Sequence, residues 1–465
     1  MVEIDELVQY QDHAEYGVQL AQSLGAKQVE LFISSEYSQK AQIEKGFTTL
    51  IQSVLDSGAF IRLVRGDKLG SVVSTDITKK GIAEAVKVAL KNASTGPSYK
   101  FGFPESKGIQ GIHINVDKQL DELKPRDISE FTRSMITSVK EVNPKIKVTD
   151  GLFSSTITAS TIANSNGVSV VDVESKIIAG VRTKVKKGRT FGSGYEYRVE
   201  PTLRDVPPED VGKKSAELSL ESVKKKRIKS GEYEIVFEPH AFADLVKSLL
   251  MEAANGKNVE KKASFLADKQ GLEVASPSLS LYDDGVYIDG ANRGLVDHEG
   301  TPTQRTPIIE KGVFKQPLYD HASAVDASTV STGNGIRYFS PLYERLYRFT
   351  PITEGTNLVL ESGHSTRDSL IEDTKNGLLV NFLIGAWSFN YNDGNFSAEA
   401  RNCFKIEQGN IVYAIDEATV SGNIMDLMKE LQIGNTPLQS RGYIPLSPAT
   451  VILPTVKAEK VAVGA

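Results

Sequence analysis

Turn signals recur at short intervals through the second half of this 465-residue chain. Between them lie short runs rich in β-branched and aromatic residues, the pattern expected of strands joined by tight turns. The turns from about residue 274 onward are Asp283-Asp284-Gly285, Asp289-Gly290, Glu310-Lys311-Gly312, Asn392-Asp393-Gly394 and Glu407-Gln408-Gly409. The second half is therefore predicted to be largely antiparallel β structure, curled or barrel-like.

The first half mixes helices and strands. Amphipathic patterns predict helices over about residues 8–24, 77–94, 128–142 and 208–226, the second of them capped near Asp76 or Thr78. Asn166-Gly167 lies between two β-branched runs and predicts a hairpin. Residues 96–126, rich in Gly, Pro and Lys, are interpreted as a long connection.

A domain boundary is expected near residues 229–232. It divides the chain into an N-terminal mixed α/β domain, 1–229, and a β-rich C-terminal domain, 230–465, so the fold class is α+β. The second domain opens with a strand and one helix. Its predicted buried stripe consists of Phe242, Leu245, Val246, Leu249 and Leu250.

Charge and cysteine content narrow the classes of function. The 54 basic and 59 acidic residues give a net charge of −5, which offers no electrostatic footprint for nucleic acid. The one basic run, residues 224–227, is read as the end of a helix, where cations are favoured. Cys403 is the only cysteine and is expected to be a buried, inert thiol in a strand, which fits a reducing compartment.

The amino-terminal stretch is acidic and mixed, unlike a signal peptide. No apolar run reaches the roughly 20 residues that span a bilayer. We therefore expect a cytoplasmic protein without membrane contact.

Familiar catalytic motifs are missing from the sequence. The six histidines are nowhere three to five residues apart, so the local histidine pair of a helical zinc site is not present. There is no Gly-x-Ser-x-Gly elbow and no phosphate-binding Gly-x-x-x-x-Gly-Lys loop. The glycines of "STGNGIRY", residues 331–338, are read as a turn. A metal site assembled from dispersed histidines and carboxylates stays open as an alternative.

The passage "DHEGTPTQRT", residues 297–306, concentrates polar side chains in one loop. One interpretation is a turn that feeds a strand. The other is a loop that binds a peptide, because Gln and Arg donate hydrogen bonds to carbonyl and carboxylate groups. The candidate peptide-binding residues are His298, Glu299, Gln304 and Arg305.

Several passages together resemble the TldD/PmbA family, once described as modulators of DNA gyrase. They are "DDGVYIDGANRGLVDHEGTPTQRTPIIEKGVFKQPLYD", "STGNGIRY", "DGNFSAEARNCFKIEQGNIVYAI", "SGNIMDLMKEL" and the early "EKGFTTLIQSVLDSGAFIRLVRGDKLG". The resemblance extends over nearly the whole chain. It implies a heterodimeric metalloprotease that cuts unfolded or small peptides.

The resemblance also implies a choice between two arms of the family. The TldD arm has a His-Glu-x-x-x-His helix that binds the catalytic metal, completed by a cysteine near the C-terminus; the PmbA arm, also called TldE, lacks these ligands. Here Met251, Glu252 and Gly256 stand at the His, Glu and His positions, and we call these three residues the vestigial motif. Neither a thioether nor a glycine suits zinc, so no metal or catalytic residue is assigned to this chain.

The expected role is therefore a noncatalytic PmbA/TldE-like subunit that shapes a substrate chamber and contacts an extended peptide. Its expected partner is a TldD-type subunit that holds the zinc, and a homodimer is expected when the chain is alone. Met251 is placed by the helical wheel away from the core, either under a neighbouring loop or at a dimer interface or peptide channel. The alternatives are an independent metal-dependent peptidase and a protein-binding regulator without catalysis, so whether the chain is itself an enzyme stays open.

Overall fold

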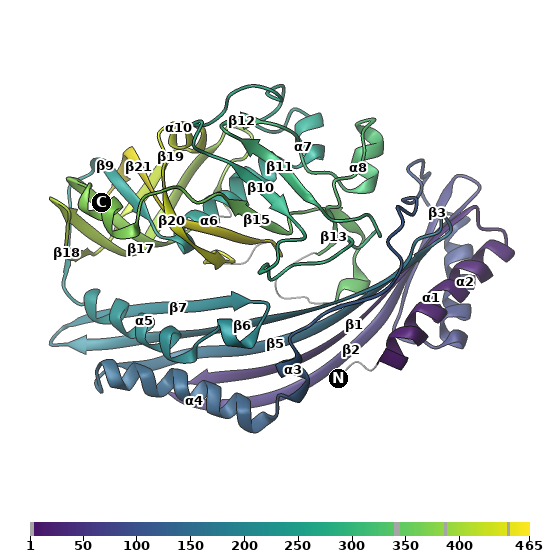
Figure 1. Ribbon diagram of the computed structural model, residues 1–465, viewed down its shortest axis with the longest axis horizontal. Coiled ribbons are helices and arrows are strands. Elements are labelled where there is room, and N and C mark those ends of the chain that lie inside the picture. Colours follow the sequence, from purple (N-terminus) through teal and green to yellow (C-terminus); the bar gives the residue numbers. More distant parts are fainter. Residues whose placement is uncertain (1–3, 339–344, 386–387, 444–446) are drawn as a thin grey trace.

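The computed structural model describes residues 4–338, 345–385, 388–443 and 447–465. Figure 1 shows a long curved sheet built by the first half of the chain, with the second half packed across one of its faces and helices on the other. None of the described helices combines the length and the apolar character of a membrane span. The predicted α+β class, with a largely antiparallel, barrel-containing second half, is confirmed.

The first sheet has the strand order β3-β2-β1-β5-β6-β4, and β7 pairs with a later stretch of the same edge of β6 that β4 occupies. Its strands are β1 (Gln28–Glu44), β2 (Phe47–Arg65), β3 (Lys68–Ser74), β4 (Gly111–Asn115), β5 (Lys147–Asn164), β6 (Ser169–Lys187) and β7 (Thr190–Glu200). All pairs are antiparallel except β4 with β6. The predicted hairpin at Asn166-Gly167 joins β5 to β6, and Gly167 has the positive φ of 86° that such a turn needs.

Alternation along the middle of β5 and β6 gives this sheet two different faces. Ile157, Ala159, Val171 and Val173 belong to a buried apolar cluster on the helix side. The residues between them are polar and point the opposite way, because successive side chains of a strand alternate. This alternation places a hydroxyl- and carboxyl-rich surface under the second half of the chain.

Four long helices cover the apolar face (Figure 1). They are α1 (Ile4–Ser23), α2 (Lys79–Ala93), α4 (Pro125–Val142) and α5 (Pro208–Glu221), close to the four predicted helices. Thr78 caps α2, as one of the two predicted positions, by accepting a hydrogen bond from the Gly81 amide. Short elements α3 (Lys118–Glu122) and η1 (Leu203–Asp205) complete this half.

Two predictions about the first half were wrong. The segment 96–126 is more than a connection, since it contains β4 and α3. The basic run at 224–227 does not end a helix: α5 stops at Glu221, and Lys225 and Lys226 form strand β8, which pairs with β18 (Asn410–Ile415) in the second half of the chain. The predicted division between 229 and 230 falls between β8 and β9 (Gly231–Phe237).

A closed five-stranded barrel is the centre of the second half. Its strands pair in the cycle β9-β16-β17-β19-β21 and back to β9. They are β9 (Gly231–Phe237), β16 (Asn376–Ile384), β17 (Asn395–Glu407), β19 (Thr419–Asn423) and β21 (Thr450–Gly464). Cys403 lies in β17 and is 3% exposed, and burial raises the pKa of its thiol to about 12, which agrees with the prediction of an inert thiol.

Further strands extend the barrel or lie beside it. They are β10 (Leu281–Asp284), β11 (Arg305–Glu310), β12 (Val313–Phe314), β13 (Gly335–Arg337), β14 (Pro351–Thr353), β15 (Asn357–Leu360), β18 (Asn410–Ile415) and β20 (Gln432–Ser440). Strands β13 and β14 form a separate two-stranded sheet. The short helices are α7 (Gly256–Glu260), α8 (His321–Asp326), η3 (Leu346–Arg348), α9 (Arg367–Glu372) and α10 (Ile424–Lys429).

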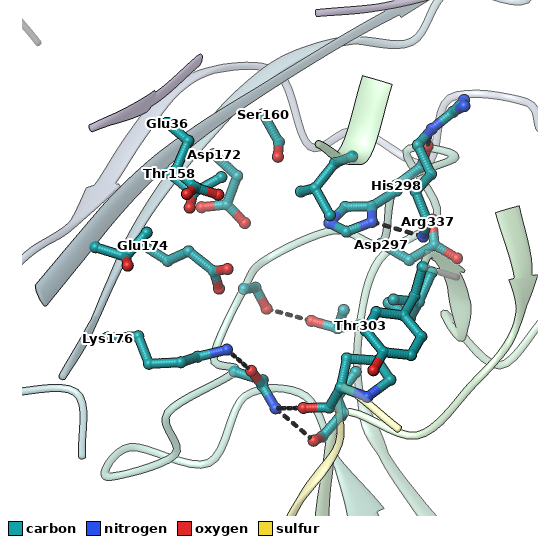
Figure 2. Close-up of a pocket in the computed structure, with 18 of the residues that line it drawn as sticks. Glu36, Thr158, Ser160, Asp172, Glu174, Lys176, Asp297, His298, Thr303 and Arg337 are labelled. Carbon is teal, nitrogen blue, oxygen red and sulfur yellow. Dashed lines mark hydrogen bonds between the residues drawn. The ribbon is translucent and has the colours of Figure 1, made fainter. Parts of the chain in front are cut away.

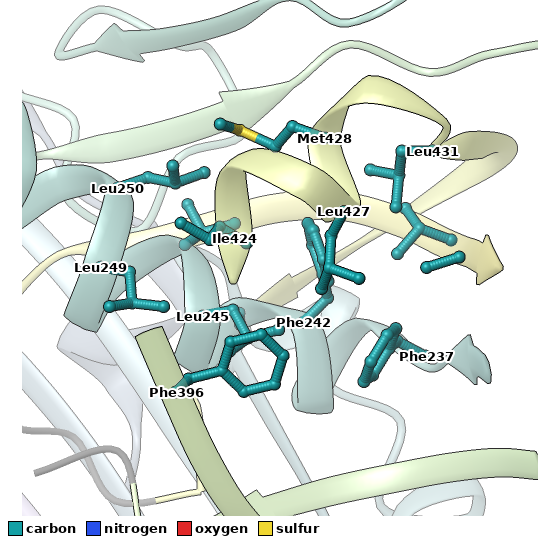
Figure 3. Close-up of a cluster of buried hydrophobic side chains, with 14 of the residues drawn as sticks. Phe237, Phe242, Leu245, Leu249, Leu250, Phe396, Ile424, Leu427, Met428 and Leu431 are labelled. Carbon is teal, nitrogen blue, oxygen red and sulfur yellow. The ribbon is translucent and has the colours of Figure 1, made fainter. Parts of the chain in front are cut away.

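The helix after β9 packs its predicted stripe into the core. Figure 3 shows Phe242, Leu245, Leu249 and Leu250 beside Phe396 of β17 and the apolar face of α10. All five predicted stripe residues are at most 2% exposed, which confirms the stripe. The helix is not regular, however: α6 (Pro239–Leu245) runs into a π-helical turn, η2 (Val246–Met251).

Buried charges join the two halves. Arg337 of β13 donates to Glu30 of β1 at 2.5 Å, and Arg62 of β2 donates to the same carboxylate at 2.9 and 2.6 Å. Burial alone would raise the pKa of Glu30, but these two guanidinium groups hold it below its ordinary value. The guanidinium of Arg337 also stacks over Phe32 at 4.3 Å from the ring centroid. This ion cluster fixes how the second half sits on the sheet.

Candidate functional site

A cleft of about 1340 Å³, counted with its open mouth, lies between the polar face of the first sheet and the loops of the second half. One wall comes from β1, β5 and β6, and the other from segments around residues 292–303, 336–338, 355–356 and 441–448. Figure 2 shows the two walls facing each other, with carboxylates on the sheet side and His298 on the loop side. Residues 444–446, within the last of these segments, lie outside the described residues.

The sheet wall is acidic because of strand register. Glu36 of β1 pairs with Thr158 of β5, which in turn pairs with Glu174 of β6, so the three form a row across adjacent strands. Asp172 and Lys176 lie two residues to either side of Glu174 on the same face of β6. Burial raises the pKa of Glu174 to about 7, and the nearby ammonium of Lys176 opposes that shift.

The loop wall is built on a tightly held turn at residues 297–301. The Asp297 carboxylate accepts hydrogen bonds from the amides of Glu299 and Thr301 at 2.9 Å each and from the Gly335 amide at 2.8 Å. Gly335 has no room for a side chain, since a Cβ there would lie 2.3 Å from the Glu299 carboxylate. The sequence "STGNGIRY" thus supplies the backbone that locks this turn in place.

This turn fixes the protonation state of His298. Its Nδ1 accepts the backbone N–H of Arg337 at 2.8 Å, so Nδ1 carries no proton and Nε2 carries it. Burial, followed by the positive charge of Arg337, lowers the pKa of His298 to about 3. Figure 2 shows the other ring nitrogen, Nε2, directed into the cleft. His298 is therefore a fixed, neutral N–H donor at neutral pH.

We expect His298 to make the protein less stable in mild acid. Below pH 6.5 the unfolded chain protonates this histidine while the folded chain does not until about pH 3, so stability falls as the pH falls through that window. Urea unfolding at pH 7 and 4.5 should show the parent losing roughly 1–3 kcal/mol more than His298→Gln. The same substitution at the exposed His364 is the matched control for loss of an imidazole. Equal losses in the parent and His298→Gln would show that the folded ring titrates as in the unfolded chain.

The four predicted peptide-binding residues do not share one surface. His298 lines the cleft. Glu299 is 3% exposed and is turned away from it, accepting the amide of His321 at 2.8 Å and lying 3.5 Å from Arg62. Gln304 and Arg305 are exposed outside the cleft, and Arg305 pairs with Glu361 at 2.7 Å and stacks over Tyr282. The loop is therefore a turn that leads into a strand, as the first interpretation had it. Of the four residues predicted to bind a peptide, only His298 faces the cleft.

The vestigial motif lies behind the loop wall of the cleft. Met251 is 1% exposed, within the apolar core, and a Cβ on the cleft residue Gly355 would lie 3.4 Å from its sulfur. The expectation that Met251 projects away from the core was wrong. The wheel assumed 3.6 residues per turn, whereas the π-helical turn η2 changes the direction of the side chain at its end. Of the two environments proposed for Met251, the structure shows the buried one.

The third position of the motif has no space for a ligand. A Cβ on Gly256 would lie 2.1 Å from Cε1 of Tyr319 and 2.8 Å from the carbonyl oxygen of Leu318. Tyr319 is held by two hydrogen bonds that it donates, one from its hydroxyl to Glu260 and one from its backbone amide to the Thr332 hydroxyl. A histidine at 256 would have to displace this ring.

The remaining polar groups near the motif do not suit a zinc ion either. Burial, and then the charge of Glu252, raise the pKa of Glu354 to about 8, and Lys247 donates to the carbonyls of Arg441 and Ser447 at 2.9 and 3.1 Å. Burial lowers the pKa of Lys247 to about 7, and a buried, partly charged amine beside two carboxyls is a poor setting for a divalent cation. Across the described ranges, no three His, Cys, Asp or Glu side chains are grouped closely enough to hold a metal ion.

A long curved sheet, a five-stranded barrel lobe and a polar cleft between them define a two-lobed α+β protein. Three stretches match known family domains: residues 29–93 match PmbA/TldA metallopeptidase domain 1, 118–223 its central domain and 230–465 its C-terminal domain. The chain belongs to the PmbA/TldD family, which confirms the resemblance found in the sequence.

Relatives of the chain include members of both arms. An uncharacterized protein of Methanocaldococcus jannaschii is 26% identical over 438 residues, 93% of this chain and 97% of the relative. A metalloprotease TldD homolog of Buchnera aphidicola is 24% identical over 431 residues, 88% and 86% of the two chains. The structure of TldE from Thermococcus kodakarensis has a TM-score of 0.89 at 22% identity, over 97% of this chain and 100% of that one, and establishes the fold.

Sequence reasoning missed the sheet wall of the cleft: Glu36, Asp172, Glu174 and Lys176. The signal was present in the polar alternation of "SSTITASTIAN" and "VVDVESK". A polar strand face in sequence is usually a solvated face, however, and only the packing of the second half turns this one into a wall.

Proposed function

We propose that this chain is a noncatalytic, PmbA/TldE-like subunit of a TldD/TldE-type metalloprotease that degrades or processes unfolded or small peptides. The observation that carries the proposal is the packing at the vestigial motif. Met251 is an apolar core residue, and Gly256 lies against Tyr319, so the two histidine positions of the TldD arm have neither the chemistry nor the space for ligands. Zinc is expected in the TldD-type partner, and the complex is expected to be cytoplasmic.

The cleft supports a role in shaping the substrate chamber. Its walls offer hydroxyls, carboxylates and one fixed imidazole N–H, which can hydrogen-bond to the backbone of an extended peptide, beside apolar side chains such as Ile162 and Ile178. It lies against the vestigial motif through Gly355. In a pair of similar subunits, we expect the corresponding cleft of the partner to hold the metal and this one to help guide the peptide.

The first sheet offers a surface for the partner. Strand β3 pairs with β2 only from Ala59 to Arg65, and no other described strand pairs with that edge of β2 between Phe47 and Gly58. Phe47 is 73% exposed and Leu55 61% exposed along this stretch. An open edge with exposed apolar side chains favours association, here with a TldD-type subunit and, in its absence, with a second copy of this chain.

The test compares the chain purified alone with the chain co-expressed with a TldD-type partner. We expect the lone chain to be a metal-free dimer without peptidase activity, and the pair to hold metal and cleave an unfolded peptide. Elemental analysis, light scattering and a peptidase assay on the same samples measure these properties. Stoichiometric metal and cleavage by the lone chain would instead establish the independent peptidase, and a monomeric lone chain would contradict the proposed self-association.

A further inference from the structure

The sheet wall contains a carboxylate that the architecture does not use. Asp172 has a structural role, accepting the Leu295 amide at 2.6 Å. Glu174 has no such role: none of the described residues donates a hydrogen bond to its side chain, and Lys176 beside it donates to Asn292. This carboxylate is half-buried and lines the open cleft, so its hydrogen-bond donors come from water or from a ligand.

The opposite wall contains a second group that points to a ligand. Nδ1 of His298 is occupied by the Arg337 amide, which leaves the Nε2–H directed across the cleft toward the carboxylates (Figure 2). No described residue accepts a hydrogen bond from this N–H. Glu174 and His298 therefore require opposite partners, a donor with positive charge for the first and an acceptor for the second.

These two requirements restrict the ligand. A metal ion is a poor candidate, because Glu36, Asp172 and Glu174 are not grouped closely enough to coordinate one. An anion would meet the three carboxylates of the sheet wall against one ammonium group, that of Lys176, which donates to Asn292. A primary ammonium group satisfies Glu174 with a charge-assisted hydrogen bond, and a backbone carbonyl satisfies His298. A peptide contains both groups, the ammonium either at its amino terminus or on a lysine side chain.

We propose that the cleft binds a peptide through a primary ammonium group at Glu174, with Glu36 and Asp172 adding negative charge, and through a backbone carbonyl at Nε2 of His298. This inference rests on the proposed function, because it specifies which peptides the cleft selects. It assigns Glu174 as a specificity-determining residue for substrates that contain an ammonium group.

The experiment uses the full chain and an uncharged, C-terminally amidated octapeptide with a fluorophore near its C-terminus. Fluorescence anisotropy compares three forms: a free amino terminus, an acetylated amino terminus, and an acetylated form with one internal lysine. We expect the free form to bind at least about tenfold more tightly than the acetylated form without lysine, as a charge-assisted hydrogen bond implies. Glu174→Gln should reduce this ratio to about twofold, and Glu459→Gln, at an exposed position on β21, is the matched control.

The three forms separate the outcomes. Tight binding of the lysine form would show that the cleft recognises an ammonium group on a side chain as well as at the amino terminus. Weak binding of this form would restrict recognition to the amino terminus. Both outcomes support the ammonium site. Equal affinity for all three forms overturns the site while leaving a peptide-binding cleft. Absence of binding by every form overturns the proposed function together with the site. The acetylation comparison needs no substitution, so it stands even if Glu174→Gln fails to fold.

Discussion

Arg337→Met is expected to lower the free energy of unfolding by about 3–5 kcal/mol, the usual cost of removing one partner from a buried ion pair. Arg337 is 0% exposed, and its guanidinium contacts Glu30 of the first sheet and the carbonyl oxygen of Phe349 at 2.7 Å. Burial lowers the pKa of Arg337 to about 10 despite Glu30, so the group is still charged at neutral pH. Its loss leaves Glu30 with only Arg62.

Urea unfolding followed by circular dichroism measures the change. Arg305→Met is the matched control, since it removes the same group from an exposed pair with Glu361 and should cost less than about 1 kcal/mol. The double variant Glu30→Gln, Arg337→Met should regain part of the loss, because the uncompensated carboxylate is gone. An Arg337→Met protein as stable as Arg305→Met would show that the ion cluster does not hold the two halves together.

Local patterns in the sequence were sufficient to predict most of the helices and the secondary-structure content of each half. The hairpin at Asn166-Gly167, the cap at Thr78 and the stripe from Phe242 to Leu250 depend on neighbours within a few residues, and all three hold in the structure. Short strands were not predicted, because they depend on residues that are distant in the sequence. Strands β4 and β8 have five and two residues, too few for a clear periodic pattern, and they form because a distant strand offers an edge.

The buried charged residues between the two halves could not be predicted from local sequence patterns. Glu30 and Arg337 are 307 residues apart, and neither lies in a pattern that distinguishes a buried charge from a solvated one. The cleft has the same origin, since Glu174 and His298 belong to different halves of the chain. His298 was singled out from its loop alone, whereas Gln304 and Arg305, chosen with it for their donors, lie outside the cavity. Composition identifies polar residues, but only packing decides which of them face one another.

Restoring the two histidines of the TldD pattern should not create a zinc site in this chain. In Met251→His, Gly256→His, the first imidazole enters an apolar core and the second collides with Tyr319, so we expect a destabilised protein without stoichiometric zinc. The steric part can be tested separately. Gly256→Ala alone adds a Cβ 2.1 Å from the Tyr319 ring and should cost about 1–3 kcal/mol, as overpacked cores do.

The background variant Tyr319→Ala distinguishes steric exclusion from a general intolerance of residue 256. With the ring removed, Gly256→Ala should cost clearly less than in the parent, because the two residues share one space. Urea unfolding of the four proteins gives this difference, and elemental analysis of the histidine variants in both backgrounds gives the metal content. A parent that accepts Gly256→Ala without loss would mean that Tyr319 can move aside. The second ligand position would then be open, and the case against a metal in this chain would rest on Met251 alone.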